Sequence, residues 1–300
     1  MKPVRSGAFQ KIAIVSAAHS VSIIMILLVL RSAYAFTLMK EIGGQLSERK
    51  GKALPGDSLM QVNEELTYEA SYLFFKVGSV KFQVLSRTTY ENRPVYRLRA
   101  FIDSYSGFPF VSFHSIYDTY ADAENLTCLF NAKSQKDGDS WIYTTTDLDF
   151  VKKKIEWEQT RDGKILNMKE MPLDTAYTDG VSFFYYLRRI CMTSGGKETT
   201  LSVPMVEDTI RSAIHITINE EREPCEVTAC NFPLDSRKLS GHIDFVGTFG
   251  VSGDFEGWIA GDSTCMPLRG KLKVILGSIV VQLKEVDRKG WSPPKSVNGD

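Results

Sequence analysis

Apolar and polar residues alternate along most of the chain between Val62 and Val286. The clearest runs place an apolar residue at every second position: Leu66, Tyr68, Ala70, Tyr72, Phe74; Val80, Phe82, Val84; and Tyr96, Leu98, Ala100, Ile102. A period of two is typical of half-buried antiparallel strands. Further runs of this kind predict about a dozen strands, without an internal repeat and without the strand-helix alternation of parallel sheets.

Turn-forming residues separate these runs. Asn92-Arg93-Pro94 and Gly107-Phe108-Pro109 interrupt the second and third runs. Asp137-Gly138 and Asp162-Gly163 are stronger signals, because Asp-Gly is the dipeptide that type I′ hairpins prefer. Tight antiparallel hairpins are therefore expected at both Asp-Gly pairs.

One stretch, TDGVSFFYYLRRI from Thr178 to Ile190, departs from the period of two. It predicts a helix over about 179–192, with Asp179 as the N-cap and Gly195-Gly196 after its end. Apolar residues occupy nearly every side of this helix, so it must be buried on nearly every side. The sequence thus predicts an all-β fold, a large antiparallel curved sheet or open barrel-like domain with one inserted buried α-helix.

The buried helix allows two interpretations. It is either a plug that fills the core, or a lid over an apolar cavity in which Tyr185, Tyr186 and Arg188 contact the head group of a ligand. Trp258, close to a glycine-rich turn, is a further candidate for ligand binding, or else an anchor for its hairpin.

The first residues are typical of a secretory signal. A basic region through Lys11 precedes an apolar stretch and Ala33-Tyr34-Ala35, which predicts cleavage after Ala35 and export to the periplasm or outer-envelope space. An uncleaved anchor is the alternative, since 12–30 is just long enough to span a bilayer. The expected organisation is a signal peptide at 1–35, a linker at 36–60, a single β domain at 61–287 and a flexible tail at 288–300. We expect the chain to contact the membrane only through the signal segment.

Charge and cysteine usage exclude some classes of protein. The chain has 36 basic and 36 acidic residues, but no acidic residue precedes Glu41, so the part after the signal is mildly acidic and does not suggest nucleic-acid binding. Export permits disulfides, yet an odd count of 5 cysteines leaves at least one thiol unpaired within the chain. Cys225 and Cys230 could join only across a turn. No C-x-x-C pair is present and the histidines are scattered, so neither a zinc site nor another cofactor is expected.

Residues of the helix also carry a resemblance to a known family. Asp179, Ser182, Tyr185-Tyr186 and Arg188 reproduce the D-x-x-S-x-x-Y-Y-x-R pattern of the bacterial exported proteins grouped as domain of unknown function 3108. Two further segments are similar to the opening and closing strands of that family: Glu65-Leu66-x-Tyr68 with Gly78, and Trp258, Asp262, Pro267 with 276–283. The resemblance spans about 62–286, with a loose match at 219–225. It implies a β-structured envelope protein without an established reaction or ligand.

Candidate catalytic groups are few. Glu156 with Glu158, and Asp147 with Asp149, share a strand face, as do His242 and Asp244. Carboxylates so close along a charged strand usually form a solvated face, and no nucleophile elbow or nucleotide-binding glycine pattern occurs. A non-catalytic envelope protein that binds a lipid-like or amphipathic molecule is therefore expected. The alternatives are an assembly factor that binds another envelope protein through a strand edge, and a hydrolase acting on glycan.

Overall fold

The computed structural model describes residues 59–106, 113–245, 252–274 and 277–296. The chain divides into two units, Met1–Gly51 and Lys52–Asp300, and all described residues belong to the second. The predicted signal peptide, most of the predicted linker and the predicted turn at Gly107 to Pro109 lie outside the described residues.

Within the described ranges the chain forms strands and one α-helix. Their bounds are β1 Glu65–Tyr72, β2 Phe75–Tyr90, β3 Arg93–Ser104, β4 His114–Asp122, β5 Cys128–Asp137, β6 Ser140–Asp149, β7 Lys154–Arg161, β8 Lys164–Pro172, α2 Gly180–Thr193, β9 Thr199–Glu207, β10 Ile210–Cys225, β11 Leu234–Ile243, β12 Gly253–Ala260, β13 Pro267–Lys273 and β14 Ser278–Asp287. No helix in this part of the chain combines the length and apolar character that a membrane crossing requires.

The strands form one 14-stranded antiparallel sheet in the order β8-β7-β6-β5-β4-β3-β2-β1-β14-β13-β12-β11-β10-β9. Each strand pairs with its neighbour in the chain, except that β14 returns to pair with β1 and α2 separates β8 from β9. β8 and β9 are the two ends of the order, so the sheet is open. The predicted all-β fold with an open curved sheet is confirmed.

The Asp-Gly pairs form the hairpins that the sequence predicts. Asp137-Gly138 joins β5 to β6, and Asp162-Gly163 joins β7 to β8. Asp162 has φ 50° and Gly163 has φ 74°, as expected for the left-handed backbone of a type I′ turn.

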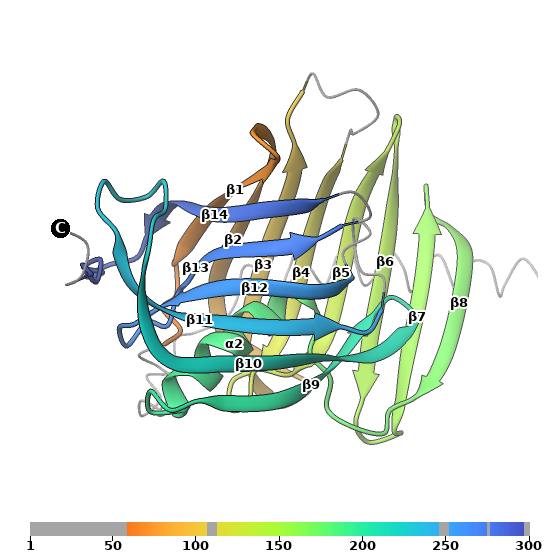
Figure 1. The fold of residues 1–300 in the computed structure, drawn as a ribbon. Helices are drawn as coiled ribbons and strands as arrows, with labels where there is room; N and C mark the ends of the chain where they lie inside the picture. The colour runs from red at the N-terminus through yellow and green to blue at the C-terminus, as the bar shows by residue number, and fades with distance from the viewer. Residues whose placement is uncertain (1–58, 107–112, 246–251, 275–276, 297–300) are drawn as a thin grey trace, which may run out of the picture. The chain divides into compact units, whose positions relative to one another are not determined.

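The sheet curls around α2, the feature that organises the interior. Figure 1 shows β9–β13 crossing in front of β2–β5, with α2 between the two layers. One side of the helix, including Val181 and Tyr185, packs against β2, β3 and β4. The other, including Leu187 and Ile190, packs against β9–β12. The predicted burial of the helix between strands is confirmed.

The last described residues pack against this domain. Trp291 contacts the cluster formed by β1 and β10–β14, and Lys295 forms an isolated bridge with Leu234. The backbone N–H of Asp235 donates to the carbonyl of Pro294 at 2.8 Å. These contacts hold part of the segment for which the sequence predicts a flexible tail. They involve single residues without a periodic pattern, so the sequence pattern does not indicate them.

Candidate functional site

The first turn of α2 is fixed by Asp179. The backbone N–H of Asp179 donates to the hydroxyl of Ser182, and the backbone N–H of Ser182 donates to one carboxylate oxygen of Asp179, each at 2.9 Å. These two bonds form a capping box, as expected for an N-cap three residues before a hydroxyl. The remaining carboxylate oxygen accepts from Thr119 at 2.6 Å and from Asn131 at 2.5 Å. The predicted N-cap is confirmed, and it also ties the helix to β4 and β5.

Arg188 extends from α2 into a buried ion pair. Its guanidinium donates to the carboxylate of Glu64 at 2.5 and 3.2 Å, and both side chains are fully buried. It also donates to the carbonyls of Thr264 and Leu59, both at 3.1 Å. Arg288 adds a second ion pair to Glu64. Each edge of the guanidinium is thus bonded to protein, and four segments of the chain meet at this group.

Tyr185 and Tyr186 differ in their surroundings. Tyr185 is fully buried, lies edge-on to Phe82 and Phe184, and has the Arg188 guanidinium 5.6 Å from its ring centre. Its hydroxyl has no hydrogen-bond partner among the described residues. Burial, followed by the charge of Glu64, raises its pKa. Tyr186 is half-buried and packs against the clusters on both sides of the helix.

Trp258 lies away from these residues. It is half-buried on β12 and packs against the cluster formed by β1 and β10–β14, whereas Tyr185 and Tyr186 belong to the clusters on the two sides of α2. Its ring lies between the charges of Lys238 and Arg269, at 5.6 and 5.5 Å, and its indole N–H donates to Glu223. The structure therefore brings Tyr185, Tyr186 and Arg188 together on one helix and separates Trp258 from them. Ligand contacts by any of the four stay a prediction.

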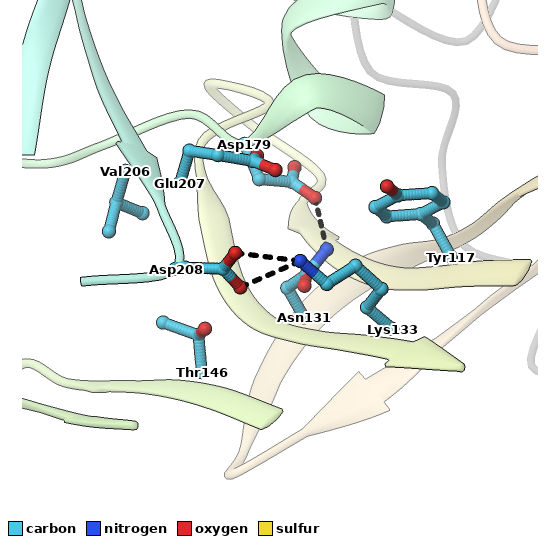
Figure 2. A pocket seen from close by; sticks show the side chains of 8 residues that line it. All are labelled: Tyr117, Asn131, Lys133, Thr146, Asp179, Val206, Glu207 and Asp208. Carbon is cyan, nitrogen blue, oxygen red and sulfur yellow. Dashed lines mark hydrogen bonds and ion pairs between the residues drawn. The ribbon is translucent and has the colours of Figure 1, made fainter. Parts of the chain in front are cut away.

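A small polar recess lies beside the N-terminus of α2 (Figure 2). Lys133 of β5 donates to both oxygens of Asp208, in the turn after β9, at 2.8 and 2.7 Å. Thr146, Tyr117, Asn131, Asp179, Val206 and Glu207 complete its walls. Its volume of about 10 Å³ is roughly what one water molecule needs. The recess itself therefore has no room for a lipid.

The candidate catalytic groups lie on exposed strand faces. His215 and His242, distant in sequence, are direct partners across β10 and β11. Asp244 lies 2.8 Å from His215 Nε2 and 3.6 Å from His242 Nε2, and Asp254 lies 2.7 Å from His242 Nδ1. All four side chains are exposed. No group of three or more metal-ligating side chains in the described part of the chain is placed to hold a metal ion.

The paired acidic residues lie at the surface beside basic ones. Lys154 binds Glu156 at 2.5 Å, and Lys152 binds Asp149 at 2.9 Å. Asp147 is less exposed, and its burial, together with the charges of Glu91 and Glu156, raises its pKa to about 6. Salt bridges along a strand face are what a solvated surface shows.

Two apolar surfaces remain uncovered among the described residues. Leu73, Phe74 and Phe75 form the β1–β2 turn, where Phe74 is 82% exposed. The second surface is β8, in which Ile165, Leu166 and Met168 are exposed, the last at 64%. Within the described part of the chain β8 pairs only with β7, so its outer edge carries backbone groups that no described strand pairs with. Sequence periodicity missed this surface, because it does not show which strand ends the sheet.

Residues 67–284 match the family described as "Protein of unknown function (DUF3108)". The chain belongs to this family. No curated protein matches the sequence. The predicted resemblance is therefore confirmed, and it extends from β1 to β14.

Solved structures give more distant likenesses. One is a β-barrel-like protein of domain of unknown function DUF1849 from Brucella abortus, with a TM-score of 0.46 and 8% identity over 76% of this chain and 98% of that chain. A protein from Bacteroides fragilis with a YmcC-like fold, proposed to be exported, gives a TM-score of 0.31 and 10% identity over 76% of this chain and 97% of that chain. A proposed lipoprotein from Parabacteroides distasonis gives 0.27 and 9% over 76% and 96%. At these identities the likeness concerns the fold alone.

Proposed function

We propose that this protein is a non-catalytic component of the cell envelope that binds an extended segment of another envelope protein, which adds as a strand to the free edge of β8. The observation that carries the proposal is that β8 combines an unpaired backbone edge with exposed apolar side chains. Strand addition uses both features, since backbone hydrogen bonds provide affinity and alternate side chains provide specificity.

The interior supports this choice. α2 is covered on both sides by the sheet, and its buried arginine, Arg188, is bonded to Glu64. The recess beside its N-terminus has room for about one water. The chemistry available for recognition therefore lies at the surface.

β8 suits a partner more than the β1–β2 turn does. Both strands of that turn are already paired on each side, with β14 and β3, so the turn offers side chains but no backbone edge. The other end of the sheet, β9, is partly covered, because Thr178 donates to Pro204 and accepts from Val206, each at 2.9 Å. Within the described residues no strand or isolated bridge lies against the outer edge of β8, although Arg211 donates to the carbonyl of Pro172 at the end of the strand at 2.8 Å.

Charges on β8 indicate the chemistry of the partner. A second copy pairing antiparallel about the centre of Ile165–Met168 would place Lys164 directly opposite Lys169, and like charges directly opposite each other destabilise a strand pair. A different protein with an apolar segment between two acidic residues avoids this repulsion. Self-association in this register is thus disfavoured, whereas a complementary partner avoids the like-charge contact.

The envelope location is supported by the predicted signal segment at 1–35 and its Ala33-Tyr34-Ala35 cleavage pattern. An exported chain without a predicted reaction requires a binding or structural role. The exposed edge of β8 is the surface that we propose for this role.

The test is site-specific photo-crosslinking in the native envelope. A photo-reactive residue at Met168 should crosslink to one protein, and Leu166→Asp should abolish the crosslink by placing a charge on the edge. The matched control is Val151, which is 93% exposed but lies in the β6–β7 turn. In the isolated complex, amide hydrogen exchange over 164–172 should slow. Equal crosslinking from positions 151 and 168, or unchanged exchange in β8, would contradict the proposal.

A second candidate is the binding of a lipid-like or amphipathic molecule beside α2, with Tyr185, Tyr186 and Arg188 as contacts. One observation favours it: the Tyr185 hydroxyl is fully buried and lacks a partner among the described residues. An unpaired buried hydroxyl costs about 1–3 kcal/mol, so such a group is usually bonded to water or to a ligand. Replacing Tyr185 tests this candidate directly.

A further inference from the structure

Two of the five cysteines are brought together where the helix meets the β12–β13 turn. Arg188 Nε donates to the carbonyl of Thr264 at 3.1 Å, which holds this side of α2 against the turn. Cys191 lies three residues after Arg188, on the same side of the helix, and Cys265 follows Thr264. Both cysteines are 4% exposed and belong to one core cluster. Both are free thiols in the structure, and their side chains lie close enough to interact with each other.

The two thiols have different electrostatic surroundings. Arg237, which is 2% exposed, lies with Nη1 3.8 Å from the sulfur of Cys191 and also donates to Ser194 at 3.0 Å. The hydrogen bond from Cys265, together with the charge of Arg237, lowers the pKa of Cys191 in spite of its burial. The hydrogen bond to Cys191, together with burial, raises the pKa of Cys265. Cys191 is therefore the sulfur that becomes a thiolate first.

The other cysteines are less suited to react. Burial raises the pKa of Cys128, of Cys225 to about 12, and of Cys230. A turn does separate Cys225 from Cys230, as their pairing would require, and both pack in one cluster, but the pKa of neither thiol is shifted by the other. The thiol contact between Cys191 and Cys265 distinguishes them from these three.

We propose that Cys191 and Cys265 are joined by a disulfide bond in the exported protein, and that the bond forms late in folding, after the end of α2, Arg237 and the β12–β13 turn have come together but before the two sulfurs are buried. This inference rests on the proposed function in one respect: export brings the chain to the oxidant. A disulfide that pins the end of α2 to the β12–β13 turn would link the helix covalently to the half of the sheet that packs on Leu187 and Ile190.

The reaction is thiol–disulfide exchange with a disulfide-bearing protein oxidant. The Cys191 thiolate attacks one sulfur of the donor disulfide, forming a mixed disulfide and releasing one donor thiolate. Cys265 then loses its proton to solvent and attacks the Cys191 sulfur, which releases the second donor thiolate. The two cysteines lose two electrons and two protons, and the donor disulfide gains both electrons.

The experiment maps the cysteines of the full chain purified from its own envelope. Free thiols are alkylated in denaturant without a reductant, and the digest is analysed by mass spectrometry. We expect a linked peptide pair containing Cys191 and Cys265, with the other three cysteines alkylated. The variant Cys225→Ser should keep the linkage, and reduction should lower Tm by about 5–15 °C. Five alkylated cysteines, or a link to another cysteine, would overturn the inference.

A second arm separates this inference from the export assumption. The purified chain is reduced, unfolded and refolded with oxidised and reduced glutathione, so that the oxidant no longer depends on the compartment. The same linked pair is expected. Refolded protein without it overturns the disulfide, whereas absence of the chain from the exported fraction of cells would contradict the envelope location alone.

Discussion

At the residue scale, the ion pair between Glu64 and Arg188 holds together the segments that surround the helix. Because both side chains are fully buried, the guanidinium depends on this carboxylate for its compensating charge. From the end of the D-x-x-S-x-x-Y-Y-x-R stretch of α2, Arg188 bonds to Glu64 and Leu59 before β1 and to Thr264 in the turn after β12. Arg188 therefore connects these segments of the chain, whether or not it also binds a ligand.

Removing that carboxylate charge should be costly. Glu64→Gln leaves a buried, unpaired arginine and should lower the free energy of unfolding by about 3–5 kcal/mol, measured by chemical denaturation. The matched control is the neighbouring Glu65, which is partly exposed and pairs with Lys81, so Glu65→Gln should cost less than about 1 kcal/mol. Equal losses from the two variants would show that the buried pair is not the connection described.

Removing the hydroxyl of Tyr185 tests whether the interior is filled by protein alone or also holds a ligand. If nothing contacts it, Tyr185→Phe should change the free energy of unfolding by less than about 0.5 kcal/mol or raise it, because the variant removes an unpaired polar group. A loss of more than about 1 kcal/mol in protein from its own envelope, absent after extraction of small molecules, would favour the ligand.

Asp147 should make stability depend on pH. Its pKa in the folded state, raised to about 6 by burial and by the charges of Glu91 and Glu156, lies above its ordinary value of 3.8. The folded protein therefore holds a proton that the unfolded chain has released between about pH 4 and 6, and stability falls as the pH rises through this window.

The variant Asp147→Asn removes this effect. It should raise the free energy of unfolding by about 1 kcal/mol near pH 7.5, a value reduced for the partial exposure of the carboxyl, and change it little near pH 3.5. Backbone and side-chain hydrogen bonds from Lys152 lower the pKa of Asp149, so Asp149→Asn should give no such gain. Thermal unfolding at the two pH values checks both expectations.

At the element scale, α2 shows what the sequence determines. Its N-cap at Asp179, its end before Gly195 and its nearly complete burial could all be predicted, because they depend on residues within one or two helical turns. The partner of Arg188 could not be predicted, since Glu64 lies 124 residues away. Likewise, His215 and His242 seem scattered in the sequence only because strand register, which the pattern does not specify, makes them neighbours.

The aromatic face of α2 should dominate its attachment to the sheet. The ring of Phe184 stacks on Phe82 at 4.0 Å between centres and meets Tyr68 edge-on, so Phe184→Ala should lower the free energy of unfolding by about 3 kcal/mol. Phe74 is the control, since it is exposed in the β1–β2 turn and Phe74→Ala should change stability by less than about 0.5 kcal/mol. Denaturant titration of the two variants gives the comparison.

At the scale of the whole described domain, the order of strands determines which two strands form the edges of the sheet. The first eight strands and the last six meet at β1 and β14, which leaves β8 and β9 as the ends of the sheet. Period-two patterns predicted the strands and the open curved sheet, but every strand of an antiparallel sheet has a similar pattern, so the pattern could not identify β8 as uncovered. The surface now proposed to bind a partner depends on this order.

A native mass spectrum of the protein purified from its own envelope tests the central claim most directly. The structure, with α2 filling the interior and β8 exposed, predicts a complex with one protein at fixed stoichiometry that is lost in Leu166→Asp, and no small molecule bound to the chain. A chain that carries a lipid-like molecule, with no protein partner and no effect of Leu166→Asp, would contradict it.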